Sequence, residues 1–108
     1  MVNIDEETEN TCKIEKIKTV YSEGELKQQV DIFKAIADPT RLNILYILEG
    51  RELCSCIIQN SLNKAQPTIS HHINILKKAN LIKGRKKGTW IYYSLTDPEI
   101  IKFLKKIK

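Results

Sequence analysis

With 108 residues, of which 42% are hydrophobic, the chain has room for one small domain or one subunit of a dimer. It begins with a polar, acidic segment that does not resemble a signal peptide, and it has no apolar stretch of bilayer-spanning length, so we expect a cytoplasmic protein without a membrane partner. Residues 1–50 carry six Lys/Arg and ten Asp/Glu, a net charge of −4, whereas residues 51–108 carry twelve and three, a net charge of +9. The basic half favours a polyanion, nucleic acid first, over the alternative of a lysine-rich solvated surface.

The N-terminal segment differs in character from the rest. Residues 1–20 are rich in Glu, Asp, Asn and Lys and contain few large apolar side chains, so we expect a flexible arm. Cys12, one of three cysteines, lies in this arm. Residues 21–108 should then form a single folded domain.

Two helices are expected at the start of this domain. From about Glu23 to Ala37, apolar residues recur at helical spacing with charges between them, which predicts an amphipathic helix. Asp38-Pro39 should end it and begin the next helix, because Asp38 can cap the new helix and proline is tolerated at its first position. Gly50 is placed to end that second helix. The second helix is apolar on nearly every side, which predicts the central buried helix of the domain.

A pair of helices set at an angle is predicted next. The first runs from about Glu52 to Leu62 and contains Cys54 and Cys56. The second begins near Pro67, and its inward stripe consists of Ile69, Ile73 and Leu76. Its opposite face carries Thr68, Ser70, His71, Asn74 and Lys78. His72 lies beside the inward stripe, which favours a hydrogen-bonded packing role over metal ligation.

A β-hairpin and a last helix complete the expected fold. One strand leads into the turn Arg85-Lys86-Lys87-Gly88, and the second runs from Trp90 to Leu95 with the alternation of a half-buried strand. Asp97-Pro98 repeats the cap-then-proline pattern, and the helix after it has an apolar stripe best buried against another subunit or the first helix. The fold class expected is mainly α with a small β-hairpin: a winged helix-turn-helix, dimeric through its terminal helices.

This arrangement predicts a protein that binds double-stranded DNA. A recognition helix presents short polar side chains to base edges in the major groove, which suits Thr68, Ser70, His71 and Asn74. The wing residues Arg85, Lys86 and Lys87 would hold phosphates or enter the minor groove, although a wing of this kind alone is equally typical of a solvated hairpin. We expect no enzyme, because the sequence has no glycine-rich phosphate loop, no paired acids in an apolar setting and no nucleophile elbow.

At these residues the chain resembles the ArsR/SmtB family of metal-responsive repressors. The resemblance covers roughly residues 25–104 and rests on Phe33-Lys34-Ala35-Ile36-Ala37-Asp38-Pro39-Thr40-Arg41, Glu52-Leu53-Cys54-Ser55-Cys56, Ser70-His71-His72 and Gly88 to Leu95. It implies a homodimeric winged-helix protein that binds its operator when metal-free and releases it when metal binds. It also implies a thiolate site at the two cysteines of the Glu-Leu-Cys-x-Cys motif, as in arsenic/antimony and cadmium/lead sensors.

The resemblance is incomplete at two positions near this site. The cadmium/lead branch recruits cysteines from the arm, usually two, and here the arm offers Cys12. Arsenic sensors of the best-known type carry a further cysteine just after the pair, and here that position is Gln59.

The chemistry of sulfur restricts which inducers the site can bind. Soft thiolates select As(III), Sb(III), Cd(II) or Pb(II) over hard cations, a third thiolate from Cys12 would complete a trigonal site, and no organic cofactor is expected. In a regular helix the side chains of Cys54 and Cys56 point about 200° apart, whereas in an extended or frayed turn they lie on one side and can converge. We therefore hypothesise that ligand binding distorts the start of their helix and moves the recognition helix packed on it.

Other interpretations of the cysteine pair and of the fold stay open. Cys54 and Cys56 could form a thiol redox switch that uses disulfide or sulfenic chemistry, or they could be small buried hydrophobes. The winged helix could also serve protein contact alone.

Overall fold

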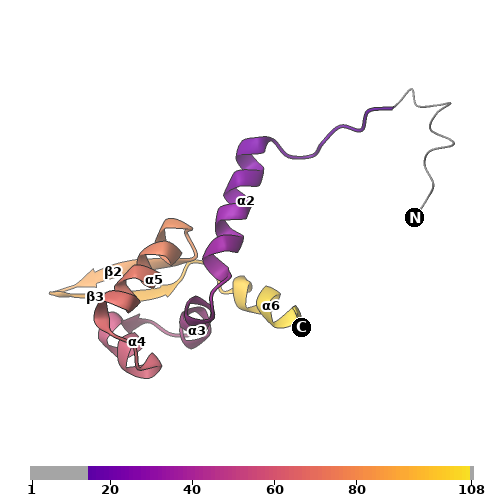
Figure 1. Ribbon diagram of the computed structural model, residues 1–108. Helices are drawn as coiled ribbons and strands as arrows, with labels where there is room; N and C mark the ends of the chain where they lie inside the picture. Colours follow the sequence, from indigo (N-terminus) through magenta and orange to yellow (C-terminus); the bar gives the residue numbers. More distant parts are fainter. Residues whose placement is uncertain (1–14, 108) are drawn as a thin grey trace.

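The computed structural model describes residues 15–107, so Cys12 and most of the expected arm lie outside the described residues. Figure 1 shows a body of short helices and a small sheet, from which the first helix projects. The elements along the chain are α2 (Glu23–Ile36), α3 (Pro39–Ile47), β1 (Leu53–Cys54), α4 (Ser55–Leu62), α5 (Gln66–Lys78), β2 (Ile82–Lys87), β3 (Trp90–Leu95) and α6 (Glu99–Lys106). The helix pair α4–α5 followed by the hairpin β2–β3 confirms the expected winged helix-turn-helix.

Side-chain caps fix where the first two helices begin. The Ser22 hydroxyl accepts from the Glu25 N–H at 3.1 Å while the Glu25 carboxylate accepts from the Ser22 N–H at 2.9 Å, a reciprocal pair that starts α2. The Asp38 carboxylate accepts from the N–H groups of Thr40 and Arg41 at 2.9 and 3.0 Å and starts α3, as predicted. α3 ends at Ile47, a few residues before the expected stop at Gly50.

The hydrophobic core is formed by buried apolar side chains from the helices and strands of the body. The inward stripe predicted for α5 is confirmed, since Ile69, Ile73 and Leu76 are all buried. α3 is the central helix expected, with Ile44 and Leu45 fully buried. The other large side chains that are fully buried are Leu48, Ile58, Ile82 and Ile101. This packing fixes which face of α5 remains open to solvent.

The sheet contains a strand that the sequence did not predict. β1 pairs antiparallel with β3, with Leu53 opposite Tyr93 and Cys54 opposite Tyr92, and the strand order is β1-β3-β2. The helix expected from Glu52 is therefore wrong in its first turn, because those residues satisfy backbone hydrogen bonds along the edge of β3 instead. α4 begins only at Ser55, with Cys54 in an extended conformation at the N-cap position.

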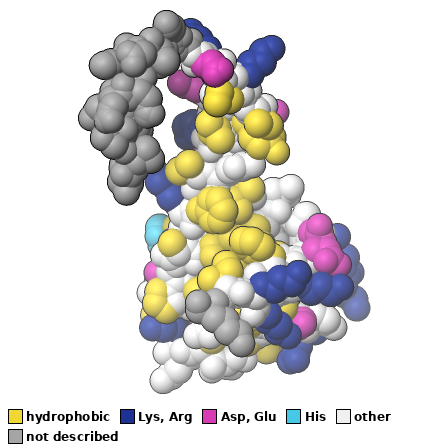
Figure 2. Space-filling model, turned by 90° about the vertical axis from the view of Figure 1, so that its right-hand side faces the viewer, with side chains coloured by type: hydrophobic (Ala, Val, Ile, Leu, Met, Phe, Trp, Pro, Cys, Tyr) yellow, Lys and Arg dark blue, Asp and Glu magenta, His cyan; other side chains and the backbone are white. Residues whose placement is uncertain are grey.

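An apolar face remains exposed on the terminal helices. Of the residues in α2, Ala35 and Ile36 are buried, whereas Leu26, Val30 and Phe33 are exposed by 45%, 46% and 57%. On α6, Ile101 and Leu104 pack into the core, while Phe103 and Ile107 are exposed. Figure 2 shows apolar side chains running down α2 and onto the body below it. None of the helices within residues 15–107 combines the length and apolar character needed to cross a membrane.

Candidate nucleic-acid interface and thiol site

The polar face predicted for the recognition helix is the solvent-facing side of α5. Thr68, His71, Asn74 and Lys78 are exposed, and Ser70 is half-buried. The Ser70 hydroxyl accepts a hydrogen bond from the Gln66 side-chain amide at 3.2 Å, so it is already engaged within the helix. The structure therefore places these five residues along one helix, with four of them open to a partner.

The three basic residues predicted to bind DNA from the wing differ in their contacts. Arg85 is held by Glu52 through two contacts, Nε to Oε2 at 3.0 Å and Nη2 to Oε1 at 2.7 Å. These hydrogen bonds lower the pKa of the Glu52 carboxyl, so the pair stays ionised. Lys86 and Lys87 are exposed near the turn, where Gly88 adopts a φ of +65°. The net positive charge of the wing tip therefore comes from the lysines.

The two cysteines of the predicted metal site lie in contact. The Sγ atoms of Cys54 and Cys56 are 2.6 Å apart, and Cys54 is buried while Cys56 is exposed. The divergence of about 200° that a regular helix would impose does not occur, because Cys54 belongs to a strand and only Cys56 to the helix. The turn from strand to helix brings side chains two residues apart to the same side.

The pair of thiols is chemically asymmetric. The hydrogen bond from Cys56, followed by the N–H of Ile57, lowers the pKa of the Cys54 thiol. The same pairing raises the pKa of Cys56. One sulfur of the pair therefore ionises more readily than an isolated thiol, which suits a soft ion that binds thiolate. Within residues 15–107 no third His, Cys, Asp or Glu completes a cluster around them.

The thiol pair and the wing share the same small sheet. Cys54 is opposite Tyr92 across β1–β3, and Tyr92 is opposite Arg85 across β3–β2. The Arg85 guanidinium lies 5.7 Å from the centroid of the Tyr92 ring. It also donates hydrogen bonds to Glu52, two residues before Cys54. A displacement at Cys54 therefore has a short route of backbone and side-chain contacts to the wing.

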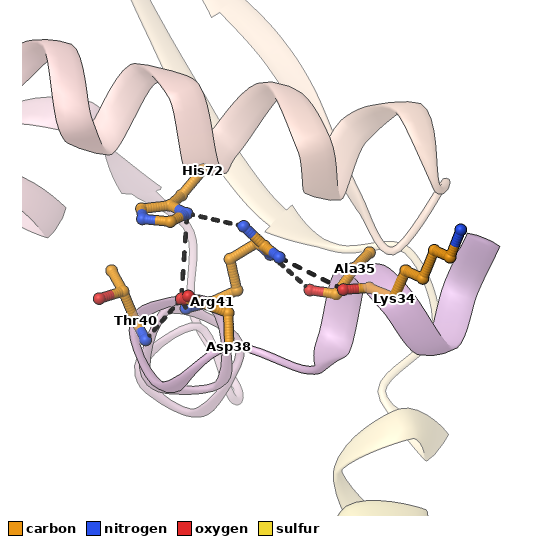
Figure 3. A network of polar contacts seen from close by, with 6 residues as sticks. All are labelled: Lys34, Ala35, Asp38, Thr40, Arg41 and His72. Carbon is orange, nitrogen blue, oxygen red and sulfur yellow. Dashed lines mark hydrogen bonds and ion pairs between the residues drawn. The ribbon is translucent and has the colours of Figure 1, made fainter. Parts of the chain in front are cut away.

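A polar network that the sequence analysis predicted only in part ties α5 to α2 (Figure 3). The expected packing role of His72 is confirmed, since its Nδ1 lies 3.0 Å from Nη1 of Arg41. Arg41 also donates to the backbone oxygens of Ala35 and Lys34 at 2.6 and 3.2 Å. Arg41 itself was missed, and the available signal was an arginine in the first turn of a helix otherwise apolar on nearly every side.

Comparison with known proteins identifies relatives over most of the chain. Residues 38–83 match the family described as bacterial regulatory protein, arsR family. An HTH-type transcriptional regulator of Methanocaldococcus jannaschii is 50% identical over 80 residues, which span 73% of this chain and 90% of that protein. The transcriptional repressor SdpR of Bacillus subtilis is 49% identical over 65 residues, 60% and 72% of the two chains. A cadmium resistance regulatory protein of Staphylococcus aureus, a CadC homolog, is 35% identical over 96 residues, 87% and 78% of the two chains.

Solved structures agree with this assignment. HlyU from Vibrio cholerae matches with a TM-score of 0.71 and 27% identity over 80% of this chain and 97% of that chain. The homodimeric winged helix-turn-helix DNA-binding domain of Mb0332 from Mycobacterium bovis matches with a TM-score of 0.72 and 25% identity over 83% and 86% of the two chains. These relatives are regulators, in agreement with the expectation of no catalytic function. On fold and sequence together, the chain belongs to the ArsR family of bacterial regulatory proteins.

Proposed function

We propose that the chain is a transcriptional repressor that binds operator DNA as a homodimer and releases it when a thiophilic ion binds Cys54 and Cys56. The inducers are of the As(III)/Sb(III) or Cd(II)/Pb(II) classes, which thiolates select over hard cations. The observation that carries this proposal is the 2.6 Å contact between the two sulfurs, at a junction joined to the wing. The cadmium resistance regulator among the relatives adds support.

The DNA-binding role follows from the surface of α5 and the wing. In protein–DNA complexes, short polar side chains contact base edges in the major groove, and basic side chains contact phosphates. The proposed base-edge residues are Thr68, Ser70, His71 and Asn74, and the proposed phosphate contacts are Lys78, Lys86 and Lys87. Because Glu52 already engages Arg85, we assign Arg85 mainly to fixing the wing against β1.

The homodimer follows from the exposed apolar face of α2 and α6. The same face of a second copy, related by a two-fold axis, would pack against this one and bury its exposed apolar side chains, which are Leu26, Val30, Phe33 and Phe103. The homodimeric winged-helix relative supports this arrangement. Two recognition helices related by such an axis would reach two half-sites about one helical turn of DNA apart.

The thiol pair supplies two of the ligands that a soft ion needs. We propose Cys12, from the same chain or its partner, as the third sulfur of a trigonal site. Because Cys54 is a strand residue, coupling does not require the unwinding of a helical turn that the sequence suggested. Instead, a shift of the Cys54 backbone reaches the wing through Tyr92.

A redox-responsive repressor is the second candidate, favoured by the same sulfur contact. Loss of two electrons and two protons to a cellular oxidant would join Cys54 and Cys56 in a disulfide. A winged helix used for protein contact alone is the alternative of another class.

A DNA-binding titration separates these candidates. Anisotropy of a labelled duplex from the protein's own promoter would be followed under reducing conditions while As(III), Sb(III), Cd(II), Pb(II) or Zn(II) is added. We expect at least one ion to release the DNA, and Cys54→Ser and Cys56→Ser to abolish the response. Cys12→Ser tests the third ligand, and unchanged ion affinity in that variant would exclude it. Release only by an oxidant would favour the second candidate, and absence of salt-sensitive DNA binding would favour a protein-contact role.

A further inference from the structure

We infer that Arg41 is a positioning residue that sets the angle between α2 and α5, and so the operator half-site spacing that the dimer accepts. The inference rests on the proposed function, because α2 carries the apolar face proposed for dimerisation and α5 carries the residues proposed to read DNA. Arg41 would then influence which DNA sites are bound through its contacts with α2 and His72, without touching DNA itself.

Arg41 is a residue of α3, and its side chain contacts two other helices (Figure 3). Nε donates to the Ala35 carbonyl at 2.6 Å and Nη2 to the Lys34 carbonyl at 3.2 Å, both in the last turn of α2. The backbone N–H of Arg41 is held by Asp38 at 3.0 Å at the start of α3. Nη1 lies 3.0 Å from Nδ1 of His72 on α5. A planar guanidinium has donors in several fixed directions, which the single ammonium group of lysine cannot reproduce.

Besides this network, α2 is attached to the body by a few apolar side chains in its C-terminal half. Its buried residues are Ala35 and Ile36, both in its last turn. Ile32, one turn earlier, is partly buried against the core, and the turns before it project from the body (Figure 1), so the direction of the helix is decided in its C-terminal half. α2 has 14 residues, which corresponds to a length of about 21 Å.

A small rotation at this end has a large effect at the other. Over a lever of about 21 Å, a rotation of about 10° displaces the far end by about 4 Å. Successive base pairs are about 3.4 Å apart along DNA, so this displacement is comparable to one base pair of half-site spacing. Under this inference, a change of about 10° in the angle that Arg41 helps to hold would shift the preferred half-site spacing by about one base pair.

The contact between Arg41 and His72 requires a neutral imidazole. Nδ1 can accept from the guanidinium only when it carries no proton. Burial lowers the pKa of His72, which keeps the ring neutral, while Asp38 at 4.0 Å acts in the opposite direction. The other charged or titratable groups that act on the ring are Arg41, His71 and Lys64, and all three lower its pKa. Protonation of His72 would place a cation against Arg41 and open the network.

The test compares spacing preference with affinity. A palindromic duplex would first be selected with the wild-type protein, and a series would then be made with the two half-sites moved closer or apart by one and two base pairs. We expect wild type to prefer one spacing by about tenfold, and Arg41→Lys to reduce that preference to about threefold or less. Affinity for a single half-site, the dimer mass and the salt dependence should stay unchanged in the variant, which a general loss of structure would not allow. Arg51→Lys, an exposed arginine beyond α3, is the matched control.

A second variant uses pH as the readout. We expect wild type to lose its spacing preference as pH falls from about 7.5 to about 5, whereas His72→Asn, which has an amide oxygen available near the Nδ1 position, should keep it. A folded, dimeric Arg41→Lys protein with the wild-type spacing profile would overturn the inference. Failure of the proposed function would look different, because wild type would then bind no duplex in a salt-dependent manner.

Discussion

The wing lysines permit a quantitative prediction about salt. Lys86→Ala combined with Lys87→Ala removes two exposed cations from each chain, and so four from a dimer. If each lysine neutralises one phosphate, the slope of log affinity against log salt should become shallower by about 3.6. Between about 50 and 200 mM salt, that difference corresponds to about 150-fold, so the wild type should lose about 150 times more affinity than the variant over this range.

The assay is anisotropy of one labelled operator duplex at four or more salt concentrations. Lys102→Ala combined with Lys106→Ala on α6 changes the net charge equally, away from the wing, and should leave the slope close to wild type. Circular dichroism and dimer mass would show that both variants fold. Equal slopes for the wing variant and wild type would refute the assignment of these lysines to phosphate.

Three further predictions concern other parts of the molecule. Phe33→Glu should convert the dimer to monomers in analytical ultracentrifugation, because it places a charge on the exposed apolar face, whereas Gln28→Glu on the same helix should not. Asp38→Ala should lower the free energy of unfolding by about 1 kcal/mol through loss of the α3 cap. The hydrogen bond from the N–H of residue 41 lowers the Asp38 pKa below 3.8, so this stabilisation is present above that pH and lost as pH falls through the folded-state pKa. If Asp38→Ala kept the acid transition of the wild type in chemical denaturation, this explanation would be contradicted. Glu52→Gln should release Arg85 for phosphate contact and steepen the salt slope by about 1.8 per dimer, and an unchanged slope would show that Arg85 stays fixed without the ion pair.

Local signals in the sequence were enough to predict most of the fold. Asp38 accepts from the N–H groups two and three positions later, and Asp97 from the N–H two positions later, so the starts of α3 and α6 could be predicted to within a residue from the local Asp-Pro pattern. The spacing of Ile69, Ile73 and Leu76 determines which side of α5 packs inward, and so which side remains for DNA.

The parts that sequence reasoning missed depend on contacts between distant residues. β1 has two residues, too few to show any alternation, and it exists because β3 offers a pairing edge about 40 positions later. The pairing of Glu52 with Arg85 joins residues 33 positions apart, and that of Arg41 with His72 joins residues 31 positions apart. Periodicity and propensity carry no information about such pairs, so the network at Arg41 and the strand that places Cys54 beside Cys56 emerged only from the fold.

The unequal exposure of the two sulfurs has a consequence for selectivity by size. A bulky electrophile arriving from solvent meets the outer sulfur of Cys56, which its raised pKa keeps protonated and weakly nucleophilic. The more acidic sulfur of Cys54 is buried and so is sheltered from such a molecule. We therefore expect the pair to resist alkylation by large reagents, and a soft ion that binds both thiolates to need no more than a small separation of the two sulfurs.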